Sequence, residues 1–433
     1  MVATLIISIV TFILVILSIL FFPHIKLGKI KLDTYWIVAL IGAVILLSFS
    51  FSPINEVYNQ LTSSSSINPL KILILFFSMT LISIFLDEFG LFKYLAVLAS
   101  NKAKGNQYTL FILLYLLTAV LTIFTSNDVV ILTLTPFICF FCKNSKINPL
   151  PYLIGEFVAA NTWSTMFIIG NPTNIYLATS AGINFLSYFK VMVIPTILGG
   201  LLELTIILLI FNKKLKEPII NSELTYKVES KVDLIIGLSI LGICLIFLII
   251  SSYINIEMWL VSLICATSLV LFTLIYRLIT KKNWCFLSNP FKRLPYQLIP
   301  FFLSMFVIVV ALNYQGISNK IATILNNDNA IWAYGYSSLF ASNIINNIPM
   351  SILYSSLPNG LSSSNYLKAI YATIIGSNIG AFLTPIGALA GIMFTSLVHK
   401  YEVKFSFLDF IKYGVIIAIP TISVELATLL MVI

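Results

Sequence analysis

Four polar interruptions divide otherwise apolar stretches of this sequence, and their residue types suit the binding of a small polar solute. Residues 125–128 read TSND, residues 342–349 read SNIINNIP, residues 159–175 read AANTWSTMFIIGNPTNI and residues 376–392 read GSNIGAFLTPIGALAGI. Irregular backbone at membrane depth is tolerated only where protein or a water-filled cavity covers it. A broken helix also exposes half-helix ends with partial positive and negative charge. We therefore expect the four interruptions to form one polar pocket near the bilayer midplane.

The alternative interpretation is that the glycines and prolines are packing kinks, since both are frequent in membrane helices. The order of the interruptions argues against it. Pairing Asn161 with Asn378 gives an offset of 378 − 161 = 217, which also pairs Gly170 with Gly387, and pairing Asn127 with Asn346 gives 346 − 127 = 219. The sequence IPTI then recurs in the last apolar segment of each half. Four matches in one order favour an internal repeat with a shared function.

Acidic residues inside apolar segments are candidates for proton or ion coupling, because a carboxylate at membrane depth is costly. Asp128 follows the first interruption and would exchange a proton or hold a cation there; helix capping is the alternative. Glu203 and Glu425 would relay protons between the closing helices of the two halves, or alternatively snorkel or pair between helices. Glu156 is expected at the membrane interface.

The composition requires a membrane to surround these segments. Hydrophobic residues make up 59% of the 433 residues and charged residues only 9%, and the mean hydropathy is +1.02. Such a chain cannot supply the surface of a soluble protein. The apolar runs predict an all-α polytopic membrane protein, with helices near 3–22, 33–51, 70–98, 150–178, 186–211, 232–252, 257–278, 297–312, 365–398 and 407–432. Residues 3–22 are expected to be a membrane helix rather than a signal peptide.

Two further apolar stretches, 108–142 and 317–357, are too short for two full spans and too long for one. We interpret each as a re-entrant hairpin. With five helices before a cytoplasmic linker at 212–231, the second half begins on the opposite face. The predicted organisation is therefore an inverted repeat, 1–211 and 232–433, with one hairpin in each half.

The positive charge of +9 lies mostly in short loops, which predicts their cytoplasmic location and places both termini outside. It forms no tract suited to nucleic acid. The loops expected inside contain Lys26, Lys29, Lys31, Lys102, Lys104, Lys143, Lys146, Lys213, Lys214, Lys216, Lys227, Lys231, Lys281, Lys282, Lys292, Arg293, Lys400 and Lys404. Lys190 is the exception to the pattern.

Other chemistry is less supported. Cys139 and Cys142 share a helical face and would allow thiolate binding of arsenite, but small buried hydrophobes are the favoured interpretation. Arg277 and Arg293 are expected near loops, which disfavours a buried guanidinium clamp on a carboxylate substrate. The chain has no P-loop and no histidine-based metal site. We expect no enzyme activity, no metal and no cofactor.

At these motifs the sequence resembles the ion transporter superfamily, and within it the arsenite efflux permease type. TSNDVVILTLTP is similar to the first-hairpin motif of that family, and ASNIINNIPMSIL to its second-hairpin counterpart. GSNIGAFLTPIGALAGIMF, with its Thr-Pro-Ile-Gly, carries the most specific resemblance. The segment GNPTNIYL is closer to anion-permease relatives that contain Gly-Asn-Pro-Gln-Asn, which leaves the substrate open. The resemblance covers about residues 70–210 and 295–433.

The resemblance implies a scaffold domain and a transport domain in each half, a homodimer, and an elevator-like movement. It also implies substrate contacts at the hairpin tips and helix breaks. These positions are Ser126, Asn127, Asp128, Asn161, Gly170, Asn171, Asn174, Asn346, Asn347, Asn378, Thr384 and Gly387.

The resulting hypothesis is a secondary transporter of the cell membrane that moves a small inorganic or organic anion or a metalloid. The specific expectation is arsenite or antimonite efflux coupled to protons, because largely neutral arsenite suits a pocket of amides and hydroxyls. A sodium- or proton-coupled carboxylate or anion carrier, or a sodium/proton antiporter, is the alternative within the superfamily. A channel and a membrane-embedded enzyme are the alternatives from other classes.

Overall fold

The computed structural model is almost entirely helical. It describes residues 1–22, 24–27, 30–62, 68–219, 226–228, 230–281, 284–327 and 329–433. Within these ranges, nine helices are long and apolar enough to cross a bilayer. The predicted positions of Lys29 and Lys282, and parts of the predicted loop and linker, lie outside the described residues.

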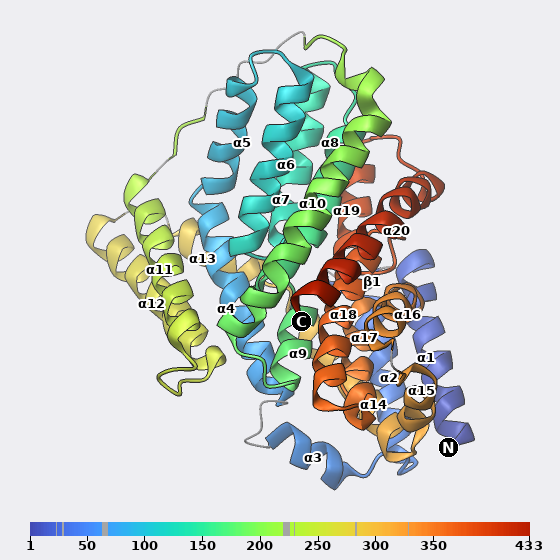
Figure 1. Cartoon of the computed structure of the whole chain (residues 1–433). Coiled ribbons are helices and arrows are strands. Elements are labelled where there is room, and N and C mark those ends of the chain that lie inside the picture. Colours follow the sequence, from blue (N-terminus) through green and yellow to red (C-terminus); the bar gives the residue numbers. More distant parts are fainter. Residues whose placement is uncertain are drawn as a thin grey trace.

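The elements follow the chain in two series of helices (Figure 1). The first series comprises α1 (Val2–Phe21), β1 (His24–Leu27), β2 (Ile30–Asp33), α2 (Thr34–Ser48), α3 (Ile54–Thr62), α4 (Pro69–Glu88), α5 (Leu91–Lys102), α6 (Gln107–Phe124), α7 (Asn127–Asn144), α8 (Leu150–Trp163), η1 (Ser164–Met166), η2 (Ile168–Gly170), α9 (Pro172–Ser180) and α10 (Phe185–Leu215). The second comprises α11 (Lys231–Ile250), α12 (Met258–Thr280), α13 (Cys285–Arg293), α14 (Leu298–Tyr314), α15 (Ile317–Leu325), α16 (Ala330–Ile345), α17 (Asn347–Tyr354), η3 (Leu357–Gly360), α18 (Ser363–Gly380), α19 (Leu389–Lys400) and α20 (Phe407–Val432).

Two peripheral helix pairs flank the central helices (Figure 1). The pair α1–α2 packs on α14 along one flank, and the pair α11–α12 packs on α4 along the other. Between them, α8 packs on α6, α7 and α10, and α18 packs on α16 and α20. The short strands β1 and β2 form an antiparallel ribbon after α1. The interrupted helices therefore lie in the protein interior, which is where irregular backbone is tolerated in a membrane.

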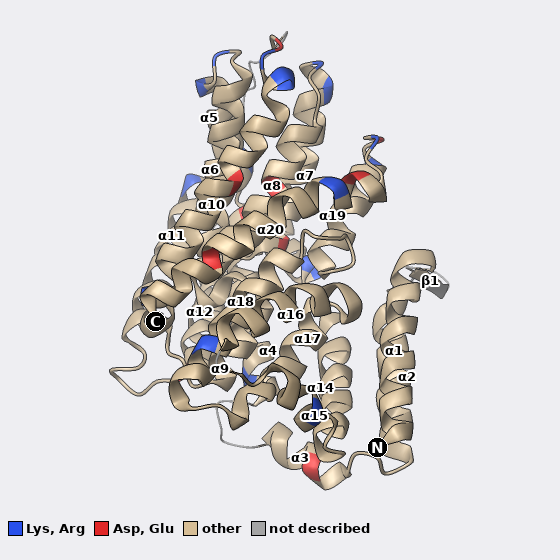
Figure 2. Ribbon diagram, turned by 45° about the vertical axis from the view of Figure 1, so that its right-hand side comes forward, with Lys and Arg blue, Asp and Glu red and all other residues tan. Residues whose placement is uncertain are grey.

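Basic side chains are unevenly distributed over the two ends of the helices. Figure 2 shows Lys and Arg gathered around the upper ends of α5 to α8 and around the α19–α20 connection, with fewer among the lower elements. Because cytoplasmic loops carry an excess of Lys and Arg, this end corresponds to the predicted cytoplasmic side. The hairpin α6–α7 begins and ends at it.

The prediction of one helix at 70–98 is wrong, because the chain breaks between α4 and α5. Gly90 adopts φ +86, which side chains disfavour. A Cβ atom at this position would also overlap the hydroxyl of Tyr226, in the connection between the two halves. Gly90 thus allows both the turn and the close approach of that connection.

The two predicted hairpins have different lengths. The helices α6 and α7 contain 18 residues each, or about 27 Å at the rise of an α-helix. In the second hairpin, α16 has 16 residues and α17 only 8. Residues 317–325, expected to belong to that hairpin, form the separate helix α15. The second hairpin is therefore residues 330–354, shorter than the predicted 317–357.

Small residues allow α16 and α18 to pack closely. A Cβ atom on Gly376 would overlap the Ser338 hydroxyl and the carbonyl of Gly335, and one on Gly380 would overlap the Ser342 hydroxyl. Close backbone approach through small residues is a common way for membrane helices to associate. This contact holds α16, the first helix of the second hairpin, against α18, the helix that carries Asn378.

Replacing Gly376 by alanine is expected to destabilise this contact by about 1–3 kcal/mol, the usual cost of overpacking. The measurement is the free energy of unfolding in detergent. Gly242→Ala is the matched control, because no heavy atom lies within 4 Å of the position of its Cβ. Equal stability of the two variants would contradict close packing of α16 on α18.

Arg277 lies near a loop, in the last turn of α12, as predicted, but its side chain is buried. The side chain is 2% exposed, is bound to the equally buried Asp233 of α11, and lies 4.7 Å from the ring centre of Phe286. A charge can be buried when an opposite charge and an aromatic face replace its water. The pair closes the α11–α12 hairpin where α11 begins.

Ion pairs also join α4 to this flank at both of its ends. The guanidinium of Arg293, in α13, lies 2.6 Å from Asp87 and 2.7 Å from Glu88 at the end of α4. At the start of α4, Lys71 Nζ lies 2.7 Å from a carboxylate oxygen of Glu257, which precedes α12.

Candidate functional site

The amide of Asn378 connects the two interrupted helix systems. Its Oδ1 accepts hydrogen bonds from Asn171 Nδ2 at 2.8 Å and from Ser164 Oγ at 2.9 Å. Its Nδ2 donates to Asn174 Oδ1 at 2.7 Å. All four side chains are at most 3% exposed. Three of the predicted site residues therefore meet in one buried network that spans both halves of the chain.

The break between α8 and α9 is built by its local sequence. Two short 3₁₀ turns follow α8, and the Asn171 side chain then caps α9 by accepting from the backbone N–H of Thr173 at 3.1 Å. Pro172 occupies the first helical position, where its missing N–H costs nothing. A Cβ atom on Gly170 would overlap the carbonyl oxygen of Ser164. The N-terminus of α9, with its partial positive charge, therefore faces the network.

The break between α18 and α19 is held by the tip of the second hairpin. The backbone N–H of Asn347 donates to the carbonyl of Gly387 at 3.0 Å, and Asn346 Nδ2 donates to the carbonyl of Ile386 at 3.2 Å. Thr384 Oγ1 donates to Asn343 Oδ1 at 2.6 Å. Asn346 has φ +71 and ψ 152, a backbone conformation that residues other than glycine rarely adopt, so the contacts of the tip must hold it there. This tip and this break are thus one structural unit.

The tip of the first hairpin meets the end of α8. Asn127 Nδ2 donates to Asn161 Oδ1 at 3.3 Å, and the Ser164 hydroxyl lies 2.6 Å from the carbonyl oxygen of Asn161. Ser126 is 3% exposed, and its hydroxyl has no hydrogen-bond partner among the described residues. A buried hydroxyl without a partner is costly, so Ser126 is available to a bound solute.

Asp128 lies beside this tip but has a different neighbourhood. Its backbone N–H donates to Asn127 Oδ1 at 2.9 Å. Its carboxylate interacts electrostatically with Tyr35 on α2. The side chain is half-buried, and its carboxylate forms no hydrogen bond among the described residues. The structure therefore places the backbone of Asp128 at the predicted tip and its charge toward the α2 flank.

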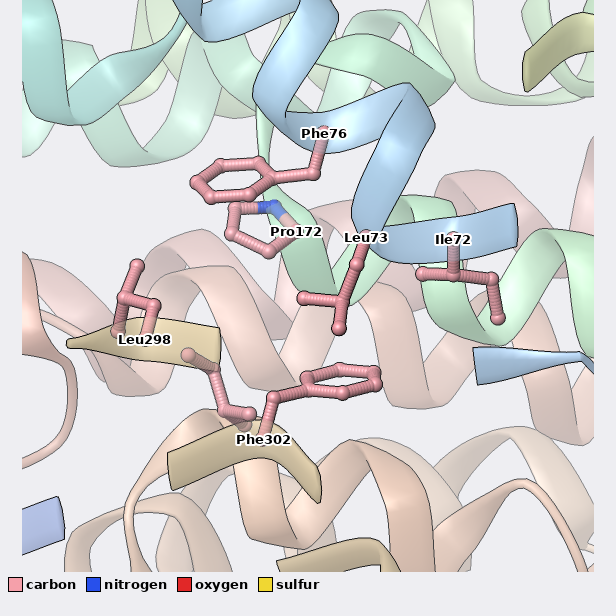
Figure 3. Close-up of a pocket in the computed structure, with 7 residues that line it drawn as sticks. Ile72, Leu73, Phe76, Pro172, Leu298 and Phe302 are labelled. Carbon is pink, nitrogen blue, oxygen red and sulfur yellow. The ribbon is translucent and has the colours of Figure 1, made fainter. Parts of the chain in front are cut away.

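An apolar seam borders the polar network. Figure 3 shows a small pocket in which Ile72, Leu73 and Phe76 of α4 face Pro172, with Leu298 and Phe302 of α14 completing the wall. Pro172 directly follows the network residue Asn171. The polar groups are thus separated from the α14 flank by hydrocarbon, which limits access of water from that side.

Residues 30–367 match the family model described as citrate transporter, CitMHS. The chain belongs to the citrate transporter family. It is a multi-pass protein of the plasma membrane.

Curated relatives of this citrate transporter family member include arsenical pumps. The arsenical pump membrane protein of Escherichia coli K12 is 28% identical over 370 residues, covering 82% of this chain and 84% of the relative. The putative arsenical pump membrane protein of Bacillus subtilis is 24% identical over 425 residues, covering 90% and 93%. The crystal structure of the Alcanivorax borkumensis YdaH transporter, described as having an unusual topology, aligns with a TM-score of 0.56 at 11% identity and covers 99% and 97% of the two chains. This likeness shows a shared fold.

Glu203 and Glu425 lie on α10 and α20, which pack against each other in this family member. Both side chains are 0% exposed. Glu203 Oε1 accepts a hydrogen bond from Thr162 Oγ1 at 2.5 Å. Since Thr162 directly follows Asn161, the carboxyl pair borders the amide network without being part of it.

Glu156 is a buried acid that the sequence reasoning placed at the membrane interface. It is 2% exposed, and the Thr135 hydroxyl lies 3.0 and 2.9 Å from its two carboxyl oxygens. The side chain is enclosed by protein because α8 packs on α6, α7 and α10. Its burial could have been inferred from the sequence, because Glu156 is surrounded by apolar residues in α8.

Two further site residues, Ser164 and Asn343, were also missed. Each is a polar residue inside one of the four interruptions, so its type and position could have identified it as a site residue. Cys139 and Cys142 are buried and form no disulfide, in agreement with small hydrophobic residues. Among the described residues, no group of three or more metal-binding side chains occurs.

The arrangement can bind a solute through amides, hydroxyls and half-helix ends. In the described part of the chain, no Lys or Arg side chain hydrogen-bonds to the Asn378 network. Amides and hydroxyls both donate and accept hydrogen bonds, so they suit a neutral or weakly charged solute that has hydroxyl groups. The buried network marks this conformation as closed to bulk water.

Proposed function

We propose that this protein is a secondary active transporter that exports arsenite or antimonite in exchange for protons. The observation that carries the proposal is the Asn378 network, which joins both halves of the chain through neutral amides and hydroxyls. Arsenite is largely neutral at neutral pH and presents hydroxyl groups, so it needs no guanidinium clamp. The arsenical pumps among the relatives support this choice of substrate.

The proposed transport cycle is an elevator-type movement in a homodimer. Each hairpin tip is hydrogen-bonded to an interrupted helix, and the two interrupted helices are joined by the Asn378 network, so these elements are suited to move together. The halves 1–211 and 232–433 would then form an inverted repeat, with re-entrant hairpins that enter from opposite sides. The proposed substrate contacts are Ser126, Asn127, Asp128, Asn161, Gly170, Asn171, Asn174, Asn346, Asn347, Asn378, Thr384 and Gly387. Asp128, Glu203 and Glu425 are the proposed coupling acids.

A sodium- or proton-coupled carboxylate carrier is the second candidate. The family description, citrate transporter, favours it. Exposed half-helix N-termini such as that of α9 can bind a carboxylate without basic side chains.

Transport assays in proteoliposomes test the two candidates. Purified protein is screened with arsenite, antimonite, citrate, succinate and sodium under imposed proton and sodium gradients. We expect proton-driven movement of arsenite and antimonite. Movement of citrate or succinate alone would assign the carboxylate function, and a response to sodium alone would overturn the metalloid proposal.

Replacing Asp128 by asparagine is expected to lower the initial rate of proton-driven transport by about 10²-fold, at the lower end of what a positioned proton-transfer group contributes. The substitution removes the charge at the hairpin tip and preserves the shape of the side chain. The measurement is the initial rate of arsenite transport with and without a proton gradient. Full proton-driven transport by this variant would remove Asp128 from the mechanism.

A further inference from the structure

The carboxyl groups of Glu203 and Glu425 form a buried pair between the last helices of the two halves. Both side chains are 0% exposed, and the two carboxyl groups interact electrostatically. A Cβ atom on Gly199, one helical turn before Glu203, would overlap the Glu425 carboxyl. The Glu425 carboxyl therefore lies directly on the backbone of α10, at a position where only glycine leaves room for it.

The hydrogen bonds of the two carboxyl groups are unequal. Glu203 accepts from Thr162 at 2.5 Å and from the hydroxyl of Tyr115 at 3.4 Å. Both carboxyl oxygens of Glu425 are buried and have no hydrogen-bond partner among the described residues. The carboxyl group of Glu203 is thus stabilised by hydrogen bonds from the protein, whereas that of Glu425 is not.

The surrounding elements supply no compensating positive charge. The titratable neighbours are Tyr115 on α6 and Tyr188 on α10, the latter interacting electrostatically with Glu425. Across the described residues, no Lys, Arg or His forms an ion pair with either carboxyl group. Two adjacent buried carboxylates cannot both stay ionised without a cation. The pair must therefore bind a proton or another cation.

We propose that Glu203 and Glu425 together hold one exchangeable proton, and that this proton is the coupling ion for the neighbouring substrate site. The inference rests on the proposed transport function and specifies where its proton resides. An O–H bond to a carboxyl oxygen forms when the proton arrives from water on one side of the membrane. It breaks when the proton leaves to the other side, so the charge of the pair changes by one and no other bond changes.

A short chain of contacts connects the pair to the substrate site. Thr162 Oγ1 donates to Glu203, and the next residue toward the N-terminus, Asn161, accepts from Asn127 at the first hairpin tip. On the other side of Thr162, Trp163 Nε1 donates to the hydroxyl of Tyr115 at 3.2 Å. A change of charge on Glu203 therefore acts on the end of α8, which carries a substrate contact.

The test uses Glu425→Gln, which replaces the carboxyl group with a neutral side chain of the same shape. Glu203→Gln is the second pair variant, and Glu402→Gln is the matched control because the side chain of Glu402 is 86% exposed. Arsenite exchange without a gradient reports binding and movement. Concentrative transport driven by a pH gradient reports coupling.

We expect Glu425→Gln to retain arsenite exchange and to lose concentrative transport driven by the pH gradient. The pH dependence of the arsenite affinity should shrink from about tenfold, within the usual range of coupling between two sites, to none. Glu402→Gln should behave like the parent protein. The proposal would be overturned if Glu425→Gln carried out concentrative transport with the pH dependence of the parent. It would also be overturned if Glu156→Gln lost the coupling while the two pair variants kept it.

Infrared spectroscopy of the substrate-free protein separates this proposal from the choice of substrate. A buried protonated carboxyl group has a C=O band that shifts in D₂O. We expect this band to weaken in Glu425→Gln and in Glu203→Gln, and to be unchanged in Glu402→Gln. If the parent moves no arsenite but shows the band change, the proposed substrate fails and the proton site stands. The proton site would be overturned if the band were unchanged in both pair variants. It would also be overturned if the addition of sodium removed the band in the parent protein.

Discussion

Replacing Asn378 by alanine is expected to abolish arsenite transport in proteoliposomes. The substitution removes the acceptor of Asn171 Nδ2 and the donor to Asn174 Oδ1, whereas the Ser164 hydroxyl keeps the carbonyl of Asn161 as its acceptor. Each buried polar group left without a partner costs about 1–3 kcal/mol. The N-terminus of α9 then loses the contact that fixes it against α18. We expect transport to fall below detection. Arsenite binding should raise the melting temperature of the parent protein, and it should not raise that of Asn378→Ala.

The control for this variant is Asn106→Ala, which removes an exposed helix cap far along the chain from the network. It should cost about 1 kcal/mol of stability and leave transport at the parent level. The melting temperature of Asn378→Ala in detergent distinguishes a folded but inactive protein from an unfolded one. A folded Asn378→Ala protein with parental transport would show that the network is structural only.

Replacing Arg277 by methionine is expected to destabilise the protein by about 3–5 kcal/mol, because Asp233 would remain buried without its counter-charge. The double variant Arg277→Met with Asp233→Leu removes both charges. Its stability should return to near the parent value, since well-packed apolar residues often replace a buried pair at little cost. The measurement is the free energy of unfolding in detergent for the two single variants and the double variant.

Transport provides the second readout for this pair. The α11–α12 hairpin lies outside the polar network, so the double variant should transport at the parent rate. If Arg277→Met is as stable as the parent, Asp233 gains another partner or is protonated. If the double variant remains as unstable as Arg277→Met, the loss arises from packing around Phe286 and not from the buried charge.

The apolar periodicity predicted most membrane helices, because lipid imposes a minimum length on each one. The predicted helix at 297–312 corresponds to α14, and the breaks expected within 150–178 and 365–398 occur there. Asp87, Glu88 and Gly90 were the local signals for the break between α4 and α5. The helices α3, α13 and α15 have 9 residues each, too few to be recognised by a criterion based on membrane-spanning length.

The residues of the candidate site were predictable from their types, whereas their partners were not. Asn171 and Asn378 are 207 residues apart and contact each other only because α9 packs on α18. Spacing along the chain cannot specify such a contact. The burial of Arg277 and Glu156 was missed for the same reason, since each depends on helices from elsewhere in the sequence.

The ion pairs at the two ends of α4 have a mechanical consequence. Lys71 ties the beginning of this helix to Glu257, and Arg293 ties its end to Asp87 and Glu88. Together with the packing of α12 and α13 on α4, these contacts at both ends oppose rotation of α4 relative to those two helices. We therefore expect α4, α12 and α13 to move as one unit if α4 moves during transport.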